Sequence, residues 1–137
     1  MSKYEYPEGI PVNCLPSWVT PGNRIIAAGN LLGFNWTIVR YRTFSTWYYC
    51  SYIQLPVEHH RRPSAEIAHN YSAFTDLMMS FRGVTFVHPE GWIGFDTADL
   101  VVNKQEILNE TLFMCETLAY DQIAYKKEKM LKYRDFL

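Results

Sequence analysis

The last third of the chain constrains the fold most, because it contains neither proline nor glycine from Lys104 to Tyr133. Asn103 and Glu106 have the spacing of a capping box, with Asn in place of Ser or Thr. After them, apolar residues recur at helical spacing on one stripe. These residues are Leu108, Leu112, Cys115, Leu118, Ala119 and Ile123. The pattern predicts one long amphipathic helix over residues 103–134.

This helix is longer than a small domain needs. At 1.5 Å per residue, roughly 30 residues reach about 45 Å. The final part, "YKKEKMLKYRDFL", is too charged for deep burial, and its cations suit the negative end of the helix dipole. We expect the excess either to pack on a second copy of the chain or to bend or fray. A homo-oligomer formed through this helix is therefore one expected assembly.

Strand patterns dominate the middle of the chain. The stretches 24–29, 34–42 and 46–55 are rich in the aromatic and β-branched residues that suit a pleated sheet, with a turn at Gly33. Alternation along residues 34–42 would place Phe34, Trp36 and Ile38 on one face with Arg40 and Arg42. The two neighbouring strands 34–42 and 46–55 predict a hairpin.

A second hairpin follows a polar loop. Residues 56–70 are interrupted by proline and predict the loop, while residues 71–81 fit either a short helix or a strand. The strand over 82–89 stops at Pro89 and reverses into 92–96, with Gly91 available for positive φ. The fold class is therefore α+β, a small antiparallel sheet of two hairpins with one long C-terminal amphipathic helix.

The N-terminal 23 residues differ from the rest. They hold four prolines, which favour neither a helix interior nor a central strand. We expect an ordered, extended arm over the core, held by Trp18 and Val19, rather than a partner-binding arm. With 137 residues, 48% of them hydrophobic, the chain suits a single domain over 1–137, its sheet region spanning 24–100.

Charge and cysteine content restrict the setting. A formal charge of −1 argues against a protein that coats nucleic acid. Cys14, Cys50 and Cys115 are too far apart for a metal pair, and an odd count does not suit a disulfide framework. The start has no signal-peptide pattern, and no segment approaches the roughly 20 apolar residues of a membrane span. We expect a cytoplasmic protein without membrane contact.

Two segments carry a family resemblance. "CSYIQLP" and "RGVTFVHPEGWIGFDTADL" resemble a set of small phage-encoded proteins of unassigned function. Their pattern is a C-G-Y-V-x-x-P strand followed by His-Pro, an H-G-G-[IL]-T-[FY] strand, a W-[WIL]-G-F-D-[CT]-A-H-x-G-D segment and a C-terminal helix. The resemblance covers about residues 46–100 and is most specific over 91–98. It implies the architecture, a phage origin and the host cytoplasm.

The chain also departs from that pattern. Asp99 stands where the family has a histidine after F-D-x-A, and no Gly-Asp follows. The strand histidine and first glycine of the family correspond to Phe81 or Arg82, depending on the alignment. The resemblance therefore implies no activity that needs those imidazoles.

Three groups of residues are candidates for chemistry. His88, Asp96 and Asp99 would supply nitrogen and oxygen ligands for a divalent metal, although short carboxylates at such corners more often bind nearby amides. The loop "EHHRR" would clamp a phosphate through its guanidinium groups, or would simply be a solvated loop. Its candidate residues are His59, His60, Arg61 and Arg62.

The third group combines arginines with rings. Arg40, Arg42 and Arg82 lie on or beside strands rich in Trp and Tyr, among them Trp92. Guanidinium groups beside aromatic faces suit a planar anion such as a nucleotide. The alternative is an ordinary sheet whose arginines lie over its rings.

No motif with a fixed catalytic mechanism occurs in the chain. We therefore expect a small phage-encoded binding protein that inhibits or sequesters a host factor, either a nucleotide immune signal or a defence protein. No cofactor and no metal are expected. One alternative is a small hydrolase of a nucleotide or phosphorylated substrate that uses His88, Asp96 and Asp99. A structural or assembly protein is the third.

Overall fold

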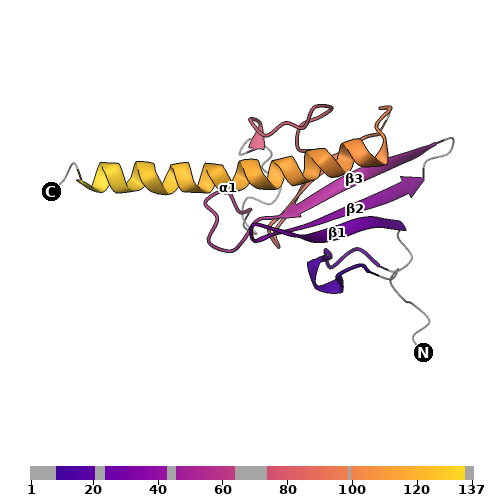
Figure 1. Cartoon of the computed structure of the whole chain (residues 1–137), viewed down its shortest axis with the longest axis horizontal. Helices are drawn as coiled ribbons and strands as arrows, with labels where there is room; N and C mark the ends of the chain where they lie inside the picture. The colour runs from indigo at the N-terminus through magenta and orange to yellow at the C-terminus, as the bar shows by residue number, and fades with distance from the viewer. Residues whose placement is uncertain (1–8, 21–23, 43–45, 64–73, 99, 135–137) are drawn as a thin grey trace.

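The computed structural model describes residues 9–20, 24–42, 46–63, 74–98 and 100–134. Five strands form one antiparallel sheet in the order β1-β2-β3-β5-β4. They are β1 (Arg24–Leu31), β2 (Phe34–Arg42), β3 (Trp47–Gln54), β4 (Phe86–His88) and β5 (Trp92–Asp96). The long helix α1 (Lys104–Arg134) lies along one face of the sheet (Figure 1). The predicted α+β fold, a small antiparallel sheet with one long C-terminal helix, is confirmed.

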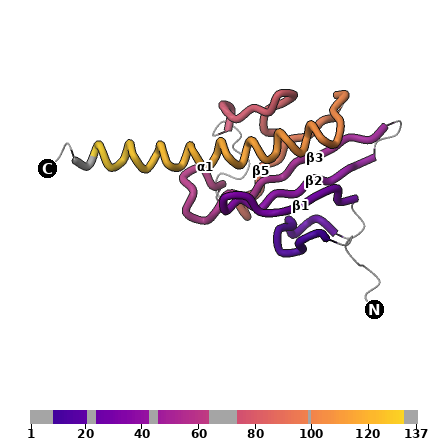
Figure 2. Tube along the Cα trace, in the orientation of Figure 1, coloured from indigo at the N-terminus to yellow at the C-terminus, as the bar shows by residue number. Residues whose placement is uncertain are grey.

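The turns explain the strand order. Leu32 and Gly33 both have positive φ, at 55° and 89°, which gives β1 and β2 a two-residue hairpin turn. Gly91, at φ 95°, supplies the predicted turn between β4 and β5. β3 then pairs with β5 rather than β4, so β5 lies inside the sheet and β4 at its edge. Figure 2 shows β1, β2 and β3 side by side.

Two predicted segments differ from the structure. The strand expected over 82–89 is regular only in β4, from Phe86 to His88. Residues 74–81 form neither a helix nor a strand, and an isolated bridge joins Met78 to Gly83. Residues 64–73 lie outside the described part of the chain. Within residues 74–81, the side chains of Phe74, Leu77 and Met79 are nevertheless buried.

The helix-side core fills the space between α1 and the sheet. The predicted alternation on β2 is confirmed, because Phe34, Trp36 and Ile38 all belong to this core. Ile53 of β3 and Ile93 of β5 continue it across the sheet without any exposed surface. This side of the sheet is a continuous apolar layer.

The start of α1 is capped as predicted. Glu106 N donates to Asn103 Oδ1 at 2.8 Å, and Asn103 Nδ2 donates to Glu106 Oε1 at 2.7 Å. The Asn103 side chain thereby satisfies the Glu106 amide, which has no helical partner in the first turn, and the Glu106 carboxylate holds that side chain in place.

The buried stripe of α1 differs in part from the predicted one. Cys115 and Leu118 are buried as expected, but Ile123 is exposed. Sequence reasoning missed Ile107 and Met114, which are both buried. Residues 126–132 are all exposed, and this end of the helix projects beyond the sheet (Figure 1). Within the described residues, no helix has both the length and the apolarity needed to cross a membrane.

The opposite face of the sheet carries a second core. Residues 9–20 run beneath β1 on the side away from α1 (Figure 1) and include a short 3-10 helix, Val12–Cys14. Val19 is buried there, and Thr37 Oγ1 donates to the carbonyl of Cys14 at 3.1 Å. Residues 1–8 and 21–23 of the expected arm lie outside the described residues.

Candidate functional site

The described residues cover only part of the face of the sheet opposite α1. The ring of Trp18 lies 5.4 Å from that of Tyr52, 5.1 Å from that of Phe86 and 4.6 Å from that of His88, between centroids. Trp18 also meets Trp92 edge-on at 6.0 Å. The N-terminal segment therefore covers the end of this face where β4 turns into β5.

Beyond Trp18 lies a hollow of about 370 Å³, which we call the open-face hollow. Alternation and register bring its residues together, because Tyr52 of β3 and Phe86 of β4 both pair with Gly94 of β5. A Cβ on Gly94 would come within 3.0 Å of both aromatic side chains, so glycine is required between them. The hollow is lined by Tyr48, Cys50, Tyr52, Arg82, Thr85, Phe86, Gly94, Phe95, Asp96 and Ala98.

An ion pair lines one side of the hollow. Arg82 Nη1 donates to Asp96 Oδ1 at 2.9 Å, and Arg82 Nη2 donates to the carbonyl of Ala98 at 2.9 Å. Asp96 Oδ1 also accepts from the amide of Ala98 at 3.1 Å. Within the described residues, the remaining N–H groups of Arg82 and Asp96 Oδ2 have no partner, so the pair can offer a ligand both donors and an acceptor.

The thiol and phenol groups around the hollow hold their protons. Burial raises the pKa of the Cys50 thiol to about 12. Burial also raises the pKa of Tyr48, Tyr41 and Tyr52, and the hydroxyls of the last two lie 3.1 Å apart. Since only the thiolate is a strong nucleophile, Cys50 is unreactive at neutral pH.

Among the predicted site residues that the structure describes, only Arg82 and Asp96 line this hollow. Trp92 is buried beneath Trp18, and His88 Nδ1 accepts from the amide of Glu90 at 3.2 Å. His88 pairs with Trp92 across the sheet, and Trp92 lies four residues before Asp96 on β5. At 3.3 Å per residue, His88 and Asp96 are therefore separated by roughly 13 Å along the strand direction.

The sequence hypothesis that His88 and Asp96 act together is therefore not supported by their positions. Asp99, the third residue of that hypothesis, lies outside the described residues. Within the described part of the chain, no cluster of three His, Cys, Asp or Glu side chains could hold a metal ion.

The loop after β3 packs against α1. The Nε2–H of His59 donates to the carbonyl of Leu118 at 2.9 Å, while Nδ1 accepts from the amide of Arg61 at 3.1 Å. The ring of His60 stacks on that of Tyr125 at 4.0 Å. His59 is buried and borders a separate apolar hollow of about 280 Å³ beside α1. Both imidazoles thus hold the loop against the helix.

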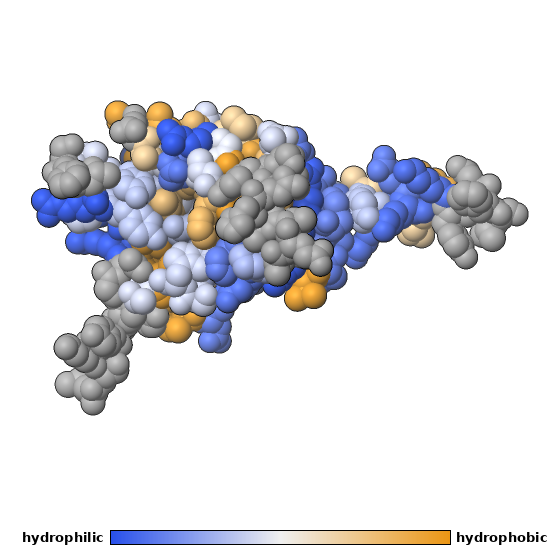
Figure 3. All heavy atoms as spheres, turned by 180° about the vertical axis from the view of Figure 1, so that it is seen from behind, coloured by the Kyte–Doolittle hydropathy of each residue, from blue (hydrophilic) through white to orange (hydrophobic). Residues whose placement is uncertain are grey.

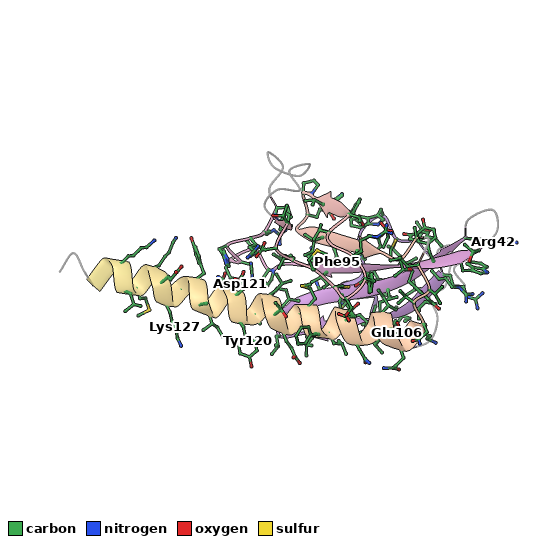
Figure 4. All side chains as sticks on the ribbon, turned by 90° about the horizontal axis from the view of Figure 1, so that it is seen from above. Arg42, Phe95, Glu106, Tyr120, Asp121 and Lys127 are labelled. Atoms are coloured by element: carbon green, nitrogen blue, oxygen red, sulfur yellow. The ribbon has the colours of Figure 1, made fainter. Side chains whose placement is uncertain are left out.

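The two arginines of this loop are also engaged. Arg61 bonds to Asp76 at 2.6 Å and to Asp121, and these partners raise its pKa. Figure 4 shows Asp121 on the side of α1 that faces the loop. Arg62 donates to the carbonyls of Leu55 and Glu90, both at 2.8 Å. These guanidinium groups therefore connect parts of the fold.

Arg40 and Arg42 lie elsewhere, at the far end of β2 (Figure 4). The guanidinium carbons of Arg40 and Arg42 lie 4.4 Å and 5.6 Å from the ring centroid of Trp47. Arg24 pairs with Arg40 across the sheet. None of these three arginines forms an ion pair with a described residue, so this end of the sheet is a basic surface with an exposed indole. The predicted ligand residues that the structure describes are thus divided among four places, since His88 and Trp92 lie together under Trp18.

Sequence reasoning missed most of the open-face hollow. Alternation over residues 46–55 already places Tyr48, Cys50 and Tyr52 on one face. The pairing of β3 with β5, which adds Gly94 and Phe86, depends on long-range contacts that no local pattern reveals.

Comparisons of this chain with family models, with curated proteins and with solved structures gave no match. The function must therefore be argued from the geometry of the chain itself.

Proposed function

We propose that the chain is a small phage-encoded binding protein that holds a planar, negatively charged, nucleotide-like ligand in the open-face hollow. By holding this ligand, the protein would sequester a host factor, namely a nucleotide immune signal. The observation that carries the proposal is the pair of rings, Tyr52 and Phe86, on either side of Gly94, with the guanidinium of Arg82 fixed beside them. The phage setting rests on the resemblance over residues 46–100.

The chemistry of the hollow suits a nucleotide. The rings of Tyr52 and Phe86, whose centroids lie 5.6 Å apart at 74°, form one wall against which a base can pack, and Arg82 can donate to a phosphate or to a ring acceptor. The free oxygen of Asp96 accepts from an exocyclic amine. A volume of about 370 Å³ lies in the lower part of the range for small-molecule pockets. One nucleotide is therefore a suitable occupant.

Binding is better supported than turnover. A hydrolase needs a base or a nucleophile beside the substrate; the thiol of Cys50 has a pKa of about 12, and the carboxylate of Asp96 is already engaged by Arg82 and by the amide of Ala98. His88, the histidine of the hydrolase hypothesis, lies under Trp18 instead of lining the hollow. The side chains that line the hollow are suited to binding and orienting a ligand.

The experiment is calorimetric titration of the full chain with AMP, GMP, cyclic AMP and cyclic dinucleotides. At least one should bind with one site per chain, and mass spectrometry should recover it unchanged. Arg82→Gln should weaken that binding about tenfold or more, because a charge-assisted hydrogen bond is lost.

Arg42→Gln is the matched control, since it removes an arginine from the other end of the sheet and should leave the affinity unchanged. Loss of binding in Arg42→Gln alone would place the ligand at that end and overturn the assignment to the hollow. A hydrolysed nucleotide, or no binding across the whole panel, would overturn the proposed function.

A further inference from the structure

The outer surface of α1 carries an unusual set of exposed apolar side chains. Five large ones are between 51% and 72% exposed, although the rest of the described helix surface is polar or small. At 100° per residue they fall within an arc of about 100°, on the side of the helix away from the buried Ile107, Met114 and Leu118. Ile123, near one border of this arc, also lines the apolar hollow beside α1. They are Phe113, Tyr120, Ile123, Met130 and Leu131.

Four of these residues belong to a heptad pattern. Exposed positions along this arc alternate at spacings of three and four residues, which is the repeat of a coiled-coil seam. The remaining two positions of the repeat hold one acidic and one basic residue. We call this set the outer seam; it consists of Phe113, Glu116, Tyr120, Ile123, Lys127 and Met130.

We propose that the outer seam pairs with the outer seam of a second copy of this chain, in antiparallel orientation. The two charged positions fix the orientation. An antiparallel pair centred between residues 121 and 122 places Glu116 opposite the Lys127 of the other copy, and does so twice by symmetry. A parallel pair would place each charge opposite its own kind, which is destabilising.

The apolar positions fit the same register. With Glu116 opposite Lys127, Phe113 lies opposite Met130 and Tyr120 opposite Ile123. Every layer of the seam thus matches a large ring with an aliphatic side chain or a carboxylate with an ammonium. One register satisfies all six positions, because the members of each pair are equidistant from the centre.

The charge of the whole helix points to the same arrangement. Residues 104–121 carry one lysine against four carboxylates, whereas residues 122–134 carry five basic residues against Glu128 alone. Antiparallel association lays the basic half of one helix beside the acidic half of the other. The attraction is therefore continuous along the helix rather than confined to one pair.

The fold leaves room for this partner. The sheet covers the opposite side of α1, and the C-terminal turns stand clear of the body (Figure 3). Figure 4 shows Tyr120 and Lys127 on the side of the helix away from the loop that binds Asp121. Two copies would therefore meet through their helices with their sheets on the outside.

Sedimentation equilibrium of the full chain over a wide concentration series tests the proposal. The protein should follow a monomer–dimer equilibrium. Glu116→Lys and Lys127→Glu should each weaken the dimer about tenfold, because each turns two attractive pairs into two repulsive ones. The double variant Glu116→Lys/Lys127→Glu should restore the original dissociation constant to within about threefold.

All these positions are exposed, so the variants keep the fold, which circular dichroism will verify. Glu128→Lys changes the charge equally but lies outside the outer seam, and it should leave the dimer intact. A monomeric protein at every concentration would overturn the proposal. So would a dimer that Glu116→Lys leaves unchanged, or a double variant as weak as the two single ones.

Discussion

The two faces of the sheet are covered to different extents. On the side of α1, long apolar stripes meet, and the buried hydroxyls of Ser51 and Thr111 pair with each other at 2.6 Å. On the other side, a short N-terminal segment covers one end through Trp18, and the other end keeps an open hollow with Arg82 and Asp96 on its wall. One face provides stability, and the other keeps polar side chains accessible to a ligand.

This difference follows from the length of the covering elements. A helix of 31 residues crosses the sheet and brings an apolar stripe with it. Residues 9–20 are too short to do the same, and Trp18 supplies much of their aromatic contact. The uncovered area therefore lies where β3, β5 and the chain after β5 meet. A binding site in a small domain is expected at such a place, because a fully covered sheet leaves no concave surface.

Truncation of a fully buried residue on the helix side should produce the largest effect. Ile93 has no exposed surface and lies within the helix-side core. Ile93→Ala removes apolar contacts and leaves a cavity, so the free energy of unfolding should fall by about 3–4 kcal/mol. Urea denaturation followed by circular dichroism measures it.

Val101→Ala is the control for this experiment. Val101 is fully exposed on the approach to α1, so its truncation should change the free energy of unfolding by less than about 0.5 kcal/mol. Similar losses in the two variants would mean that the helix side is not the main source of stability.

Local sequence patterns predicted the helix side well. The capping pair at Asn103 and Glu106, the turn glycines and the alternation on β2 are all local features, and each is confirmed. The exposed Ile123 shows the limit of this reasoning. A helical stripe tells which residues share a face, but only the sheet determines where along the helix that face stops being covered.

The N-terminal segment that covers the second face should contribute less to the free energy of unfolding than the helix-side core does. Trp18→Ala removes the ring contacts with Tyr52, Phe86 and Trp92, and should lower the free energy of unfolding by about 2–3 kcal/mol. The fluorescence of the buried Trp92 should also shift to longer wavelength, because water gains access to its indole.

Trp47→Ala serves as the matched variant, since this indole is half exposed at the end of the sheet. It should cost less than about 1 kcal/mol and leave the emission of Trp92 unchanged. If Trp18→Ala cost no more than Trp47→Ala, the N-terminal segment would not be a structural part of the second face, and the contrast between the faces would weaken.

The candidate site was harder to predict than the fold. Residues 59–62 have the composition of an anion clamp, yet their contacts reach Asp76, Leu118 and Asp121, between 15 and 60 positions further along the chain. Arg82 and Asp96 were identified, but Phe86 and Gly94 were not, because strand order decides which residues of β4 and β5 face them. Residue type predicts chemistry, whereas long-range pairing decides whether the group remains free to perform it.

The smallest expected effect concerns His59, the buried histidine at the edge of the helix-side core. Its ring lies 5.6 Å from that of Phe34, and burial lowers the pKa of His59 below its usual value. The unfolded chain therefore takes up a proton at this residue more readily than the folded protein does. Its contribution to stability is complete above the unfolded pKa of about 6.5 and is lost as the pH falls through the lower folded pKa.

The free energy of unfolding should therefore decrease by about 1 kcal/mol between pH 7 and pH 5, since protonation of Nδ1 breaks its hydrogen bond from the amide of Arg61. His59→Gln should flatten this slope while remaining folded, because Gln can still donate to the carbonyl of Leu118. Urea denaturation at several pH values measures both proteins. An equal slope in the variant would mean that the titrating group lies elsewhere, and that the helix side is insensitive to pH over this range.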